Sequence, residues 1–189
     1  MKIHLLGPSG SGTTTLGKAL ASALSIPHFD SDYFFWIPTS PPFTTKRPTN
    51  ERIDMLKSTL NGLDSWILSG SMLKWGDFLK PVLDIVIYKY VAQEIRIPRL
   101  IKREKNRYGD RIDNGQDMHK QHFEFITWAK NYETGGLEMR SKTSEEAWMK
   151  SLKCKIIRIE NEIAIKEELS IVLSAVNGIC GAPTSANTV

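Results

Sequence analysis

Residues 2–24 read KIHLLGPSGSGTTTLGKALASAL, and this stretch decides the fold. Residues 2–6 are apolar enough for a short buried strand, and residues 7–12 form a turn that contains three glycines. Residues 13–24 place apolar side chains at the spacing of a helix. A strand, a glycine-rich turn and a helix in this order indicate the opening of a βαβ unit.

The turn and the start of the helix, GPSGSGTTT at residues 7–15, follow the phosphate-binding pattern G-x-x-x-x-G-K-[ST] at all fixed positions except one. Gly7, Gly12 and Thr14 match, whereas Thr13 stands where the lysine belongs. In such a loop the backbone N–H groups and the helix N-terminus hold phosphate, and the Thr14 hydroxyl would face Mg²⁺. The alternative is a plain glycine-rich turn before a well-capped helix. Nucleotide-binding residues are predicted throughout the loop: Gly7, Ser9, Gly10, Ser11, Gly12, Thr13, Thr14 and Thr15.

The rest of the chain alternates between strand and helix patterns. Further strands are predicted at residues 26–29, 66–68, 84–90 and 155–159, and helices at 50–62, 96–111, 116–133, 143–151 and 163–176. Pro98 is expected to kink the helix that contains it or to mark its start. This alternation predicts an α/β fold with a parallel sheet covered on both faces. Ligands of such sheets bind beyond the carboxyl ends of the strands, so the segments after the first three strands are expected to share one site.

Length and composition describe one ordinary domain. The chain has 189 residues, 41% of them hydrophobic, and a net charge of +4. Its two cysteines lack metal-site spacing and are typical of reduced thiols in a cytoplasmic protein. The N-terminal apolar stretch is too short for a signal peptide, and no run approaches the ~20 apolar residues of a membrane span. We expect a single domain over residues 1–177 and a disordered tail over residues 178–189, which carry no charged side chain.

Two aspartates follow the second predicted strand, in the segment Asp30-Ser31-Asp32. Residues two apart in an extended segment point the same way, so both carboxylates can face one site. Phosphoryl transfer needs oxygen ligands for Mg²⁺ and a carboxylate that orients the acceptor hydroxyl. The alternative is a turn or a helix cap. The next four residues, YFFW at 33–36, either wall an acceptor pocket, with Trp36 against the substrate, or pack in the core.

The positive charge is concentrated in residues 96–111, RIPRLIKREKNRYGDR, which have seven basic and two acidic side chains. One compact basic helix suits a clamp for a small anion; a solvated helix face and a nucleic-acid contact are the alternatives. An arginine of this run, or Arg140, is the best candidate to replace the missing loop lysine. Lys18 is a poor one, because it lies about 140° round the helix from Thr13.

Taken in order, these segments resemble the adenylate-kinase-like P-loop kinases, and within them the small adenylate-kinase-related, "topology modulation"-type proteins. The likeness covers residues 2–176. It includes GPSGSGTTTLGKALA, PHFDSDYFFW, WILSGS, DIVIY with the arginine-rich RLIKREKNR, HFEFITWAKNY and CKIIRIEN. The resemblance implies a three-layer α/β/α P-loop NTPase fold with a five-stranded parallel sheet and a helical lid insertion over residues 96–150. Thr13 in place of the lysine, and Ser69 in place of an aspartate at a strand end, depart from the family pattern.

The resemblance also implies site residues. Asp30 would lie near Mg²⁺ and Asp32 would hold the acceptor, as in shikimate-kinase-type enzymes. Lid arginines that clamp the triphosphate match Arg99, Arg103, Arg107 and Arg111, and the first three are predicted to be catalytic. Arg52 would contact a phosphate or carboxylate of the acceptor. Gly70 and Arg140 complete the predicted acceptor site.

Three functions follow from these patterns. The first is an ATP- and Mg²⁺-dependent kinase for a small nucleotide, nucleoside or other hydroxyl-bearing metabolite, with no nucleic-acid or membrane partner. The second is a nucleotide-binding protein with little or no phosphoryl transfer, because the loop lysine is absent. The third is a nucleic-acid-associated protein that uses the basic helix.

Overall fold

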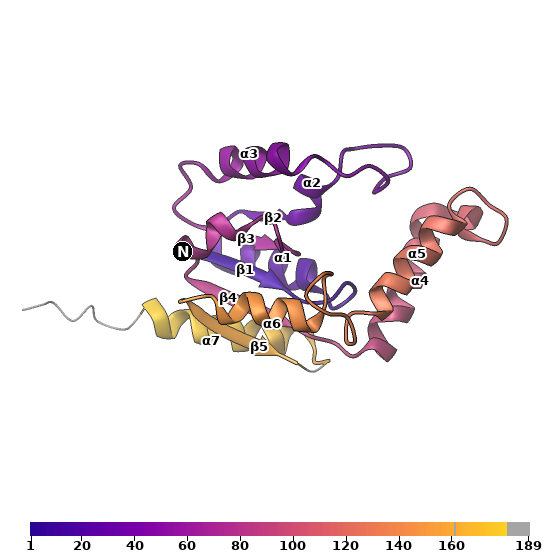
Figure 1. The fold of residues 1–189 in the computed structure, drawn as a ribbon. Helices are drawn as coiled ribbons and strands as arrows, with labels where there is room; N and C mark the ends of the chain where they lie inside the picture. The colour runs from indigo at the N-terminus through magenta and orange to yellow at the C-terminus, as the bar shows by residue number, and fades with distance from the viewer. Residues whose placement is uncertain (161, 181–189) are drawn as a thin grey trace, which may run out of the picture.

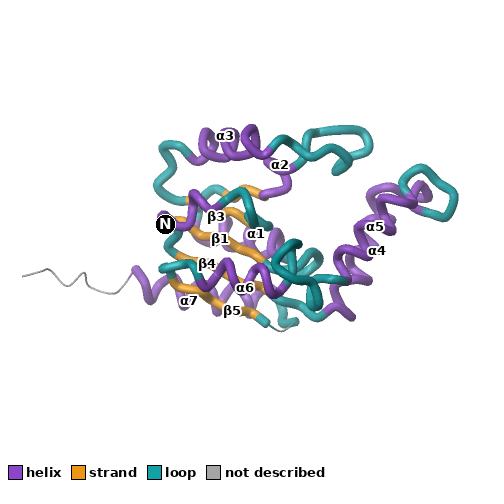
Figure 2. Tube along the Cα trace, viewed as in Figure 1, coloured by secondary structure: helices purple, strands orange, loops and turns teal. Residues whose placement is uncertain are grey.

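The computed structural model describes residues 1–160 and 162–180, and its centre is a parallel sheet of five strands in the order β2-β3-β1-β4-β5 (Figure 1). The strands are β1 (Lys2–Leu6), β2 (His28–Asp30), β3 (Trp66–Ser69), β4 (Ile85–Lys89) and β5 (Lys155–Ile159). Helices lie on both faces of the sheet (Figure 2), so the three-layer α/β/α prediction is confirmed.

Helices connect the strands and form the outer layers. Those of the first half are α1 (Thr13–Leu24), α2 (Ser31–Phe35), α3 (Thr49–Leu60) and the 3-10 helix η1 (Asp77–Val82). Those of the second half are α4 (Gln93–Tyr108), the 3-10 helix η2 (Gly109–Ile112), α5 (His119–Lys130), α6 (Lys142–Lys150) and α7 (Ile165–Cys180). None of the described helices is both long and apolar enough to cross a membrane.

Strand alternation divides the core into two layers. Ile85 and Ile87 of β4 face α1 and α7, where Leu16 and Val172 are buried. The intervening Val86 of β4 packs on the opposite face. There the core is completed by α2, α3 and α6 through Phe34, Leu56, Leu60, Trp148 and Met149.

Helices α4 and α5 form a hairpin that extends away from the sheet (Figure 1); we call residues 93–130 the lid. Arg96, with no exposed surface, joins the lid to the segment after it. Its guanidinium donates to the Glu133 carboxylate at 2.5 Å and to the Ala129 carbonyl at 2.6 Å. A small apolar cluster with Leu100 and Ile126 holds the two helices together. The positive charge of Arg96 is therefore neutralised where the lid meets the segment that follows it.

Several boundaries differ from the sequence predictions. α4 begins at Gln93 and continues through Pro98, so the proline neither starts nor ends it. Of the insertion predicted over residues 96–150, α6 packs on the sheet, because Trp148 and Met149 are part of the main core. α7 reaches Cys180, so residues 178–180 of the expected disordered tail are helical. The rest of that tail, residues 181–189, lies outside the described residues.

His4 of β1 generates a prediction about pH and stability. It is 1% exposed, its Nδ1 donates to the Leu68 carbonyl at 2.9 Å, and its ring lies edge-on to Trp148. Burial is the main cause that lowers the pKa of His4 from 6.5 to about 4. The unfolded chain therefore binds a proton that the folded chain does not bind between these pH values, and the free energy of unfolding falls as the pH falls.

We expect this histidine to remove up to about 3 kcal/mol of stability between pH 7 and pH 4. Urea titrations across this range should show a shallower decline for His4→Asn than for the wild type. His119→Asn is the control, because the His119 ring is only half-buried. Parallel declines in the wild type and His4→Asn would contradict the assignment.

Candidate phosphate-binding cleft

A cleft of about 350 Å³ opens at the carboxyl edge of the sheet. Its walls come from the loops after β1, β2 and β3, from one face of α4 and from the segment before α6. The lining residues are Pro8, Ser9, Gly10, Gly12, Thr13, Thr14, Thr15, Asp30, Asp32, Gly70, Ser71, Arg99, Leu100, Arg103 and Arg140. The three segments that we expected to share one site therefore lie together here.

The phosphate loop (residues 7–15) adopts a conformation that depends on glycine. Gly10 and Gly12 have φ values of +86° and +91°, in the left-handed region. The N-terminus of α1 has no side-chain cap, and its first turn contains no acidic residue. Its uncapped N–H groups and the positive end of the helix dipole favour an anion in the cleft. The alternative of a well-capped helix is not what the structure shows.

Thr14 and Asp30, the predicted metal residues, are in contact. The Thr14 hydroxyl donates to one oxygen of Asp30 at 2.8 Å, and the other oxygen accepts from the Asp32 N–H at 3.0 Å. Asp30 thus caps α2, which confirms the helix-cap interpretation, and its side chain also lines the cleft, where its role toward Mg²⁺ stays a prediction. Within the described residues, no group of three or more His, Cys, Asp or Glu forms a metal cage. The pair suits Mg²⁺ that is held by one or two protein oxygens and by substrate phosphates.

Asp32 lines the cleft beside Asp30. Desolvation and the Asp30 carboxylate raise the pKa of Asp32, against the opposing charges of Arg140, Arg103 and Arg107. A carboxyl group with a raised pKa is a better proton acceptor when it is ionised. The environment of Asp32 therefore fits a group that orients a hydroxyl and takes its proton.

The end of β3 brings Gly70 into the cleft. Gly70 has φ +102°, and a Cβ there would lie 2.0 Å from the Ser31 hydroxyl oxygen. Ser69 shares a 2.9 Å hydrogen bond with Nε2 of His28. Burial lowers the pKa of His28, which favours the neutral ring. The Ser69 side chain therefore faces β2 and α1, and the cleft is lined at this strand end by Gly70 and Ser71.

The four predicted lid arginines do not share one position. Arg99 and Arg103 line the cleft, although Arg99 also forms an ion pair with Glu162. Arg107 pairs with Glu104 at 3.0 Å and lies over the Phe43 ring, so its charge reaches Asp32 from outside the cleft wall. Arg111 pairs with Asp117 at 2.5 Å near the tip of the lid.

Arg140, in the segment just before α6, also lines the cleft. Its Nη2 donates to the Gly7 carbonyl and its Nε donates to Glu145 at 3.0 Å. The side chain is 19% exposed. A guanidinium therefore touches the phosphate loop itself.

Three predicted substrate residues are not in the cleft. The Arg52 guanidinium lies 3.8 Å from the centre of the Phe35 ring and donates to the Arg47 carbonyl, because the adjoining aromatic residues bury it. Trp36 packs edge-on against Phe35 and pairs with Lys46 across the proline-rich loop. Arg111 is held by its ion pair with Asp117. Of the aromatic run, Phe34 is part of the core.

The cleft also contains residues that sequence reasoning missed. Pro8, Ser71 and Leu100 line it, and each adjoins a residue that had been predicted. Lys89 lies under the loop: its carbonyl would be 1.9 Å from a Cβ on Gly7, and its side chain passes within 3.2 Å of one on Gly12. A lysine at the end of the buried strand DIVIYKY was the available signal.

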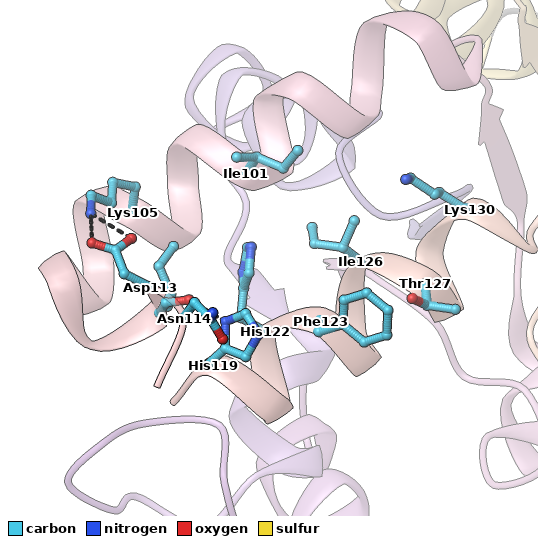
Figure 3. Close-up of a pocket in the computed structure, with 11 residues that line it drawn as sticks. Ile101, Lys105, Asp113, Asn114, His119, His122, Phe123, Ile126, Thr127 and Lys130 are labelled. Atoms are coloured by element: carbon cyan, nitrogen blue, oxygen red, sulfur yellow. Dashed lines mark hydrogen bonds and ion pairs between the residues drawn. The ribbon is translucent and has the colours of Figure 1, made fainter. Parts of the chain in front are cut away.

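A second hollow of about 450 Å³ lies between α4 and α5 (Figure 3). Ile101, Phe123 and Ile126 supply its apolar wall, and Lys105 at its rim is bound by Asp113. No residue of the phosphate loop reaches it. The cleft at the sheet edge, where charge and backbone N–H groups converge, is therefore the candidate site.

Comparison with solved structures identifies the class of fold. The shikimate kinase from Acinetobacter baumannii in complex with shikimate aligns with a TM-score of 0.57 and 19% identity, over 96% of this chain and 95% of that one. The gluconokinase from Sinorhizobium meliloti 1021 aligns with a TM-score of 0.55 and 14% identity, over 94% and 92% of the two chains. The chain has the P-loop kinase-like fold.

Sequence comparison identifies the family. The chain is 40% identical over 171 residues to the uncharacterized protein YqaC of Bacillus subtilis (strain 168), a match that covers 90% of this chain and 94% of that protein. The chain therefore belongs to the same family as YqaC. No family model matches the chain.

The cleft geometry predicts that Gly70→Ala destabilises the fold by roughly 1–3 kcal/mol, through backbone strain and contact with Ser31. Gly62→Ala is the control: Gly62 also has positive φ (+76°), but nothing lies within 4 Å of a Cβ there. It should lose only the strain, about 1 kcal/mol. Chemical denaturation measures both losses. If Gly62→Ala costs as much as Gly70→Ala, the close approach to Ser31 does not matter.

Proposed function

We propose that this protein is a kinase that transfers a phosphoryl group from Mg²⁺–ATP to a small hydroxyl-bearing metabolite, such as a nucleotide, a nucleoside or another compound of that size. One observation carries the proposal. The uncapped N-terminus of α1, the Thr14–Asp30 pair, Asp32 and Arg103 all line the same cleft. Phosphoryl transfer requires groups that bind the phosphates, hold the metal ion, orient the acceptor and neutralise developing negative charge, and these four features would supply them in that order.

The nucleotide would be held mainly by backbone groups. N–H groups of the phosphate loop and the first turn of α1 would contact the phosphates. The Thr14 hydroxyl and the Asp30 carboxylate would hold Mg²⁺. Bound Mg²⁺–ATP supplies the transferable phosphoryl group. Arg99 and Arg103 would approach from the lid and neutralise charge that develops during transfer.

The acceptor would lie between Asp32 and Gly70. Asp32 would accept a hydrogen bond from the attacking hydroxyl and take up its proton as the acceptor oxygen bonds to the γ-phosphorus, the bond from that phosphorus to the bridging oxygen breaks, and ADP leaves. We place the reaction in the cytoplasm and retain the adenylate-kinase-like relationship as part of this proposal. The named neighbours, a shikimate kinase and a gluconokinase, support a hydroxyl acceptor but do not identify it.

Thr13 favours a second candidate, a nucleotide-binding protein with little or no phosphoryl transfer. The lysine of the usual pattern reaches the outer phosphates, and contacts of that kind contribute several kcal/mol in the transition state. A nucleic-acid partner has weaker support, because many basic side chains of residues 96–111 are buried or form ion pairs within the protein. Arg96 is buried, and Lys105, Arg107 and Arg111 form ion pairs with nearby carboxylates.

Thermal unfolding with ATP, ADP and GTP, each with and without Mg²⁺, tests the nucleotide site. Binding to the folded state alone adds RT ln(1 + [L]/Kd), about 2.7 kcal/mol at one hundred times Kd. We expect a Mg²⁺-dependent rise of the melting temperature with ATP. No rise with any nucleotide at millimolar concentration would refute both the kinase and the nucleotide-binding proposal.

Asp32→Asn separates transfer from binding. We expect turnover with an acceptor found by screening to fall 10²- to 10⁴-fold, because the amide cannot take the proton. The Kd for ATP should stay within a few-fold of the wild-type value. Asp54→Asn, at an exposed position of α3, is the control and should change neither quantity. Turnover that survives Asp32→Asn would exclude Asp32 from the proposed role.

A further inference from the structure

The phosphate loop of this protein lacks the lysine that contacts the outer phosphates in the usual pattern. At position 13 the side chain is a threonine, so the positive charge near the outer phosphates must come from elsewhere in the fold. We propose that Arg140, positioned by Glu145, is the fixed phosphate-contacting cation that takes the place of this lysine. The inference rests on the proposed function, since it presumes that a nucleotide binds in the cleft.

The contacts of Arg140 point to this role. Its Nη2 donates to the Gly7 carbonyl, the first residue of the phosphate loop, and the residue lines the cleft. The third guanidinium nitrogen of Arg140, Nη1, forms no hydrogen bond with any protein atom of the residues that the structure describes. The guanidinium of arginine is planar and rigid, so the bonds made by Nε and Nη2 also fix the direction of the Nη1 donors. That geometry suits a phosphate oxygen in the cleft.

Glu145 holds the guanidinium in position. It has no exposed surface; one of its oxygens accepts from Arg140 Nε and the other from the Tyr132 hydroxyl at 2.6 Å. The Tyr132 hydroxyl lies 3.0 Å from that of Tyr88 on β4. Burial and the Glu145 carboxylate raise the pKa of Tyr132, so its hydroxyl stays protonated and continues to donate. An unbroken series of hydrogen bonds therefore runs from Tyr88 on β4 through Tyr132, Glu145 and Arg140 to Gly7 of the phosphate loop.

The backbone around Arg140 is also constrained. Ser141 is the N-cap of α6 and forms a reciprocal capping box with Ser144, with bonds of 2.9 and 3.0 Å. Both serines are buried. A charge fixed in this way needs no rearrangement when phosphate binds, which is the property that makes such groups effective in catalysis.

The other cations near the loop are less suitable. Lys89 pairs with Glu168 of α7, both side chains are almost fully buried, and Lys89 does not line the cleft. Arg99 has Glu162 as a partner. Arg103 lies in the cleft, but it belongs to the lid, which extends from the body of the fold. Arg140 alone among these residues combines a place in the cleft with a contact to the loop.

The test measures binding of ATP and Mg²⁺ by calorimetry and needs no acceptor. Arg140→Gln alone would leave Glu145 as a buried unpaired charge, so the main variant is the double substitution Arg140→Gln with Glu145→Gln. We expect its Kd for ATP to rise at least tenfold. Arg158→Gln is the matched control: Arg158 pairs with Glu146 and Glu160 away from the cleft, and its loss should leave the Kd unchanged.

Restoring the lysine gives the decisive arm. Thr13→Lys added to the double variant should recover most of the lost affinity, whereas Thr13→Lys in the wild type should add little, because the charge is already present. Glu145→Gln alone, which releases Arg140 without removing it, should weaken ATP binding several-fold and should also be rescued by Thr13→Lys. A residue that only stabilised the fold would change the melting temperature, and a new lysine would not correct its effect.

The outcomes separate the two proposals. If the wild type binds ATP and the double variant binds it equally well, or if Thr13→Lys restores nothing, the role of Arg140 is refuted and the nucleotide site stands. If the wild type binds no nucleotide, both proposals fall. If the double variant does not fold, Arg140→Lys replaces it: a lysine ammonium lacks the planar fork that binds Gly7 and Glu145 through two nitrogens and leaves a third for phosphate, so its Kd should also rise. A wild-type Kd there would refute the role.

Discussion

The carbonyl oxygen of Lys89, the last residue of β4, would lie 1.9 Å from a Cβ on Gly7. Only glycine permits this approach, and through it the phosphate loop rests directly on the end of the neighbouring strand. The path of the loop then points the N-terminus of α1 into the cleft. The cleft at the carboxyl edge of the sheet depends on this contact, because a displaced loop would carry its N–H groups away from Asp30 and Arg140.

Positive charges in this molecule have two separate uses. Arg96 and Lys89 are buried and paired with Glu133 and Glu168, so they join elements of the fold. Arg103 of the lid and Arg140 of the segment before α6 both line the cleft. A buried carboxylate is present in both uses, but its effect differs. Glu168 neutralises Lys89 beneath the loop. Glu145 instead binds Arg140 only at Nε, which orients the guanidinium toward the loop and leaves its other nitrogens to form further bonds.

Local patterns predicted that the phosphate loop, the Asp30–Asp32 segment and the end of β3 meet at one edge of the sheet, because each lies within a few residues of a strand whose direction sets its position. The same reasoning failed for Arg52 and Trp36. Both are close in sequence to the predicted acceptor segment, yet aromatic neighbours turn Arg52 towards Phe35. Side-chain direction on either side of a loop with four prolines depends on packing partners that no short pattern contains.

The sequence by itself determined the layer architecture of this protein and the edge of the sheet at which its candidate site lies. Alternating strand and helix patterns admit few folds, and the left-handed backbone at residues 10 and 12 is a local conformation that glycine adopts without strain. Only the tertiary structure decided which cations face the cleft. Arg140 is separated from the phosphate loop by more than a hundred residues, and it reaches Gly7 because the chain returns from the lid to α6 beside β1 and β4. Such a meeting depends on long-range packing, and a sequence pattern cannot specify it.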